Sequence, residues 1–249
     1  MYVAASTDCF PDKRMPEVAE MLAHQEFSSI EISLREDGTA LSPSRIAGEF
    51  DRAVDLAVRS HRLDVCAYDV HISAAGEEYF QQFEAVCRLG KATKVVTLTV
   101  PSAELGTPFN EEVERLQKLV KLADGEGVRV AVKAQHGCLS GDPDTVKVLC
   151  DNVEGLGLTF DPSHYMLGDH ELKRLDKIMP YVYHVHLRDS TKDKVQVRVG
   201  QGTVDYSKMI LMLNRFNYEH ALSIQMEPLP GLDQAAELRK LRLLLETMV

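Results

Sequence analysis

Two short segments of the sequence hold residue types that ligate metal ions and transfer protons. In LTFDPSHYMLGD, Asp161 ends an apolar run and His164 follows three residues later. In YHVHLRD, His184 and His186 are two residues apart, so they share one face of a β-strand. A carboxylate and an imidazole at neighbouring strand ends can bind a metal ion or face a substrate. His186 is nearer the end of its run and is the better candidate ligand, whereas His184 is a candidate for a supporting or core position.

Polar side chains also end four other apolar runs, namely Glu31, His71, Lys133 and Gln225. Bringing so many polar groups together is costly unless they bind something. Glu31 or His71 alone could instead close hydrogen bonds within the fold.

Three more polar residues, Arg188, Gln196 and Arg198, lie in or near the loop that follows YHVHL. A guanidinium can make paired hydrogen bonds to hydroxyls or to a phosphate. The alternative is ordinary solvated loop charge. The predicted substrate contacts are His71, His164, Arg188 and Arg198.

Eight short apolar runs must position these side chains, and they begin about 30 residues apart, the length of one strand with its crossover helix. Amphipathic stretches with apolar residues at helical spacing lie between them, for example 15–25, 44–60 and 111–127. This α/β alternation predicts a parallel sheet covered by helices, and eight units predict a closed (β/α)₈ TIM barrel. A doubly wound open sheet is the alternative, but no GxGxxG follows the first run. The runs are 2–6, 28–33, 63–72, 94–100, 128–134, 156–160, 181–187 and 221–226.

Composition narrows the class of protein further. The 249 residues suit one barrel, so we expect a single domain over 1–249. A net charge of −10 without a Lys/Arg cluster argues against nucleic acid as a partner. No apolar run reaches the roughly 18 residues of a membrane span, and the N-terminus lacks the pattern of a signal peptide, so we expect a cytoplasmic protein. The five scattered cysteines lack CxxC spacing and are expected to be reduced.

Several motifs together resemble the sugar isomerase/epimerase family of the xylose isomerase-like group, which includes ketose 3-epimerases, inosose dehydratase and, more distantly, endonuclease IV. They are ASTDCF, GKATKVVTLTV, DPSH, HVHLRD, VQVRVGQGTVDY and ALSIQM. The resemblance implies a xylose isomerase-like TIM barrel that acts on a small sugar or sugar phosphate by proton transfer next to a carbonyl. It also implies one divalent ion, Mn²⁺ or Mg²⁺, held by a glutamate, an aspartate, a histidine and a second glutamate. Asp161 and His186 match two of these ligands.

The other two ligand positions depart from the family. Lys133 and Gln225 stand where the family has the glutamates that also serve as acid and base. With Lys133 at +1 and Asp161 at −1, the four side chains sum to zero formal charge, so a divalent ion would meet an ammonium. We expect Lys133 to pair with Asp161 or Glu31 instead, and we take Lys133, Glu31 and Gln225 as the candidate catalytic residues. Glu227 or His136 could supply a displaced metal ligand.

Three functions remain open on these residues. The first is an isomerase or epimerase for a small sugar, and the second is a catalytically degenerate sugar-binding or regulatory barrel. The third is an aldolase-like enzyme that forms a Schiff base through Lys133. An endonuclease is disfavoured by the acidic composition. The sequence leaves a homodimer open.

Overall fold

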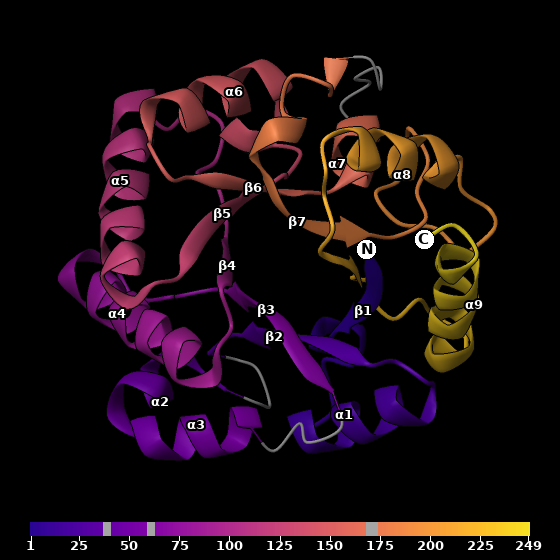
Figure 1. The fold of residues 1–249 in the computed structure, drawn as a ribbon, viewed down its shortest axis with the longest axis horizontal. Coiled ribbons are helices and arrows are strands. Elements are labelled where there is room, and N and C mark those ends of the chain that lie inside the picture. The colour runs from indigo at the N-terminus through magenta and orange to yellow at the C-terminus, as the bar shows by residue number, and fades with distance from the viewer. Residues whose placement is uncertain (37–40, 59–62, 168–173) are drawn as a thin grey trace.

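The fold is a closed eight-stranded parallel barrel (Figure 1). The computed structural model describes residues 1–36, 41–58, 63–167 and 174–249. The strands pair in chain order and β8 closes on β1, which confirms the predicted closed (β/α)₈ TIM barrel. That 1–249 forms one domain stays a prediction. The strands are β1 (Tyr2–Ser6), β2 (Ser29–Leu34), β3 (Asp64–Val70), β4 (Thr97–Val100), β5 (Arg129–Lys133), β6 (Gly157–Phe160), β7 (Val182–Leu187) and β8 (Ala221–Ile224).

Helices surround the barrel and cover its outer face (Figure 1). They are α1 (Met15–His24), α2 (Pro43–Gly48), α3 (Phe50–Val58), α4 (Gly76–Thr93), α5 (Phe109–Glu126), α6 (Pro143–Asn152), α7 (Pro162–Leu167), α8 (Tyr206–Arg215) and α9 (Gln234–Glu246). The single helix predicted over 44–60 is wrong in its described part, because α2 and α3 meet at Glu49, whose φ of −130° and ψ of 53° leave the helical region. Gly48, a weak helix former, precedes this break. Residues 59–60 of the prediction lie outside the described residues.

The strands are buried on both faces, which is why their sequences read as nearly continuous apolar runs. All residues of β2, β4, β6 and β8 are buried. Ile30, Ile32 and Leu98 are fully buried in the core between sheet and helices. The predicted run at 94–100 begins too early, because Lys94 caps α4 with a left-handed φ of 61°. No helix of the described residues has the length and apolarity needed to cross a membrane.

Side chains from different strands meet in layers across the barrel interior. Strand register pairs Ser33 with Asp69, and one layer deeper it pairs Glu31 with Ala67. His186 pairs with Ser223 in the same deeper part of the barrel. The carboxyl end of the barrel therefore presents an upper layer to the opening and keeps a second layer beneath it.

Candidate active site at the barrel mouth

A cavity of about 240 Å³ lies at the carboxyl ends of the strands. Five of the predicted site residues line it: His71, Lys133, His164, Arg188 and Gln225. They come from five different strands or from the loops that follow them, so the barrel closure alone brings them together.

Lys133, the last residue of β5, is paired with a carboxylate that the sequence reading missed. Its Nζ lies 2.6 Å from Oδ2 of Asp69 on β3. The expected partners, Asp161 or Glu31, are therefore wrong. Burial would raise the pKa of Asp69, but the Lys133 ammonium and His71 hold it well below its usual range. Asp69 is two residues before His71 and has the same strand parity, which is the signal that could have found it.

Arg188, just past β7, bridges the ends of two other strands. Its guanidinium donates to Oδ2 of Asp161 and to Oε1 of Gln225, each at 2.8 Å. Burial would raise the pKa of Asp161, yet the charge of Arg188 and the imidazole of His164 lower it to about 2. Gln225 in turn donates to Asp69 at 3.1 Å, so the two ion pairs form one network.

The residues at the predicted metal position do not fit a divalent ion. Asp161, the carboxylate that would hold the ion, already accepts from Arg188, and Gln225 offers its carbonyl oxygen to the same guanidinium. Lys133 adds a second cation to the mouth. Two side-chain cations thus stand near the position that a metal would need, and a third positive group there would be repelled.

Two histidines border the cavity, one directly after β3 and one in the first turn of α7. His71 Nε2 lies 3.2 Å from Asp69 Oδ1, an ion-pair distance, and its side chain is 30% exposed. His164 Nδ1 accepts from the backbone N–H of His136 at 3.2 Å, which leaves the ring hydrogen on Nε2. Burial lowers the pKa of His164, so its ring is neutral near pH 7. The mouth therefore offers one imidazole next to a carboxylate and one neutral imidazole that can donate.

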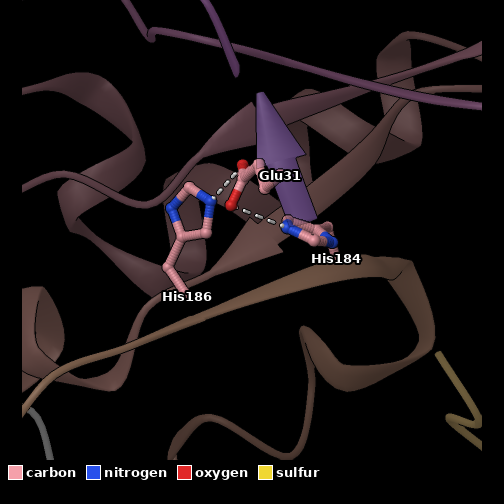
Figure 2. A group of neighbouring side chains, drawn as sticks. All are labelled: Glu31, His184 and His186. Atoms are coloured by element: carbon pink, nitrogen blue, oxygen red, sulfur yellow. Dashed lines mark hydrogen bonds and ion pairs between the residues drawn. The ribbon is translucent and has the colours of Figure 1, made fainter. Parts of the chain in front are cut away.

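Glu31 and the two histidines of β7 lie together in the deeper layer (Figure 2). Oε1 of Glu31 is 2.7 Å from Nε2 of His186, and Oε2 is 3.4 Å from Nε2 of His184. Burial would raise the Glu31 pKa, but the two imidazoles hold it below its usual range. Glu31 is fully buried and is not among the residues that line the mouth cavity, so a direct contact with substrate has no support from its position.

Of the remaining predicted residues, Arg198 lies outside the cavity lining. Its side chain is 47% exposed and its Nε is 3.4 Å from Oε1 of Glu237 on α9. Gln196 exchanges hydrogen bonds with the backbone of Glu227, at 2.7 Å and 2.8 Å. Glu227 lines the cavity. His136 contacts His164 through its backbone.

The mouth is also lined by two charged residues that were not predicted from the sequence. Asp8 follows β1 and forms an ion pair with Arg35, which follows β2. Arg35 also lies 4.0 Å from Oδ2 of Asp69. Asp8 stands inside the ASTDCF motif, and Arg35 is two residues beyond the buried Ser33, so strand-end position was the available signal in both.

The contacts of Asp189 account for the glycines in the stretch after β7. Its Oδ2 accepts the backbone N–H groups of Gly200 and Gly202 at 2.7 Å and 2.9 Å. A Cβ on Gly202 would lie 1.8 Å from Oδ1 of Asp189, so only glycine allows this approach. The motif therefore fixes the loop that carries Gln196 and Arg198.

The sequence profile of the xylose isomerase-like TIM barrel family matches residues 20–245. An inosose dehydratase from Clostridium perfringens is 28% identical over 52% of this chain and 52% of its own length, so the chain matches about half the length of this curated relative. A D-tagatose 3-epimerase-like protein superposes with a TM-score of 0.76 at 17% identity, over 100% of this chain and 98% of that one. An IolI protein with a bound zinc atom superposes with a TM-score of 0.75 at 15% identity, over 100% and 99%.

Proposed function

This chain belongs to the xylose isomerase-like TIM barrel family, and from that premise we propose that it isomerises or epimerises a small sugar at the barrel mouth. The proposed reaction transfers a proton next to a carbonyl and uses no ion at the family's metal position. One observation carries the proposal: two imidazoles, His71 and His164, border the same cavity as the ammonium of Lys133. An acid, a base and a fixed positive charge are the groups that enolisation requires.

Lys133 is the proposed cation that polarises the carbonyl of the substrate. Its side chain is 11% exposed and lines the cavity, so its ammonium can donate a hydrogen bond to a ligand oxygen while it also donates to Asp69. As a proton leaves the carbon next to a carbonyl, negative charge develops on the carbonyl oxygen. A fixed cation in a site with little water stabilises that charge strongly.

His71 is the proposed base and His164 the proposed acid. Asp69 faces Nε2 of His71, which leaves Nδ1 to take the proton from carbon. His164 carries its hydrogen on Nε2. For epimerisation, His71 takes the proton from one face of the carbon and His164 delivers one to the other face, after which exchange with solvent resets both rings. For isomerisation, the proton on His71 returns to the neighbouring carbon, while His164 protonates the former carbonyl oxygen and takes the proton of the neighbouring hydroxyl. Each proton removed is matched by one delivered, so the reaction needs no oxidant or reductant.

The charge balance of the mouth favours an uncharged sugar over a sugar phosphate. Arg35, Lys133 and Arg188 are each paired with a carboxylate, those of Asp8, Asp69 and Asp161. Three cations against these three carboxylates and that of Glu227, which also lines the cavity, leave no net positive charge to attract a phosphate. The cavity volume of about 240 Å³ is also below the usual range for ligand pockets, about 300–1,000 Å³, which suits a small substrate.

Proton exchange in D₂O tests the proposal. Ketoses and aldoses are incubated with the enzyme in the presence of EDTA, and deuterium next to the carbonyl is followed by NMR. We expect exchange to continue in EDTA and to fall at least about 100-fold in His71→Gln and in His164→Gln, as loss of an acid or base does. Exchange that stops in EDTA and returns with Mn²⁺ would contradict the metal-free mechanism.

A sugar-binding barrel without catalysis is the second candidate. The network of Asp161, Arg188, Gln225 and Asp69 favours it, since these groups satisfy one another without a ligand. In that case sugars would raise the melting temperature while no deuterium enters them. A homodimer and a cytoplasmic location stay predictions.

A further inference from the structure

A second cluster of metal-ligating groups lies one layer below the mouth. It consists of Glu31 on β2 and of His184 and His186 on β7 (Figure 2). One ligand atom from each residue lies within 4.8 Å of the others, and all three residues are buried. β2 and β7 are not neighbours in the barrel, because β1 and β8 lie between them.

Among the described residues, two ring nitrogens of this cluster, Nε2 of His184 and Nδ1 of His186, are buried without a hydrogen-bond partner. Oε1 of Glu31 faces Nε2 of His186 at 2.7 Å, and Oε2 accepts from the hydroxyl of Ser223. Nε2 of His184 points to the same carboxylate from 3.4 Å but is buried without a hydrogen bond. Leaving a buried polar atom unpaired is costly, and a cation between the carboxylate and the two rings would remove that cost.

The distances suit the ligand shell of an ion such as Zn²⁺. Ligand atoms held about 2.0–2.2 Å from zinc in a tetrahedron lie about 3.3–3.6 Å apart. The 3.4 Å between Nε2 of His184 and Oε2 of Glu31 falls in this range. The 2.7 Å between Nε2 of His186 and Oε1, the other oxygen of the same carboxylate, requires the His186 ring to move by less than about 1 Å. Ser223 already orients the carboxylate. Two imidazoles and one carboxylate favour zinc-type ions over magnesium or calcium.

We propose that Glu31, His184 and His186 bind a structural divalent ion of the zinc type inside the barrel. The site differs from the family's metal position, with which it shares only His186, and it lies at the level of Ala67 and Ser223. Because its residues are buried, the ion stabilises the fold by joining β2 to β7 and does not contact substrate. The proposal is independent of the function proposed above.

Metal analysis and anomalous diffraction test the site on the unaltered chain. The protein is purified without chelator, analysed for metals, and then stripped and reloaded with Zn²⁺. We expect one ion per chain and a melting temperature several degrees higher in the loaded form. An anomalous map at the zinc edge should show a peak between Glu31 and the two imidazoles. A peak next to Asp161, or no ion after reloading, would overturn the proposal.

Two variants separate the buried site from the mouth. His184→Gln should lower zinc occupancy at least about 10-fold at limiting zinc, as loss of an orienting or ligating group does. Asp161→Asn, which removes the carboxylate of the family's position, should retain one ion. The opposite result would overturn the proposal. If His184→Gln fails to fold, X-ray absorption on the zinc-loaded unaltered chain decides the matter, because two imidazole ligands are required and a single one contradicts the site.

Discussion

At the scale of single residues, the pair between Lys133 and Asp69 is the most consequential contact of the mouth. Lys133→Met would remove the nearest cation of Asp69, which is fully buried, and leave it the more distant Arg35 at 4.0 Å and the ring of His71. We expect the free energy of unfolding to fall by about 3 kcal/mol, because a buried carboxylate that loses its closest ion-pair partner is strongly destabilising. Urea denaturation measures the loss.

A surface pair provides the matched control. Lys147 and Asp151 are paired on α6 with both side chains 44% exposed. Lys147→Met should lower the free energy of unfolding far less than Lys133→Met does, because solvent screens an exposed pair. Equal losses in the two lysine variants would mean that Lys133 does not compensate a buried charge.

Single residues also determine whether the mouth binds a metal ion. Replacing both departures, Lys133→Glu with Gln225→Glu, gives three carboxylates together with Asp161 and removes one cation. We expect the double variant to bind one Mn²⁺ more per chain than the parent, measured by elemental analysis after gel filtration. Gln225→Glu alone keeps the ammonium and should gain none. A double variant that gains no ion would mean that Arg188 excludes the metal by itself.

At the scale of elements, the loop after β7 depends on the close approach of Gly202 to Asp189. Gly202→Ala places a methyl group against the carboxylate, and we expect a loss of about 1–3 kcal/mol of stability. Thermal and urea unfolding check it.

The control substitution is Gly125→Ala in α5, where an added Cβ meets nothing within 4 Å. It should raise stability by about 0.5–1 kcal/mol, because alanine is the better helix former. A Gly202→Ala variant as stable as the parent would show that the loop adapts without this contact.

The helices and strands could be predicted from the sequence where their burial determines which residues are apolar. Apolar runs alternate with amphipathic stretches because parallel strands are covered on both faces, and this pattern was sufficient for the barrel. The break at Glu49 was not, since it is a single residue inside a continuous helical pattern. The partner of Lys133 was missed for another reason: several carboxylates converge on the mouth, and their relative distances depend on strand register, which no spacing within one run encodes.

At the scale of the whole molecule, buried carboxylates make stability depend on pH. The pKa of Asp161 is about 2 in the folded chain, against about 3.9 in an unfolded one. The resulting stabilisation is present above the unfolded value and is lost as the pH falls through the folded one. Asp69 acts in the same direction.

We therefore expect the free energy of unfolding to decline between about pH 4 and pH 2, by about 2 kcal/mol for Asp161 alone. Urea midpoints at a series of pH values measure the slope. Asp161→Asn lowers stability at pH 7 and should flatten the slope. A stability that does not change as the pH falls to 2 would contradict the pairing with Arg188.

The guanidinium of Arg188 has one consequence for how this barrel works in a cell. It is a counter-ion tethered to the chain, present at a fixed effective concentration whatever the supply of metals around the protein. No chelator can remove this guanidinium, and no competing metal ion can take its place. The same tether forbids exchange, since an arginine cannot open a coordination position for a substrate oxygen as a bound metal does. The mouth thereby needs no metal ion at this position and gives up ligand exchange there.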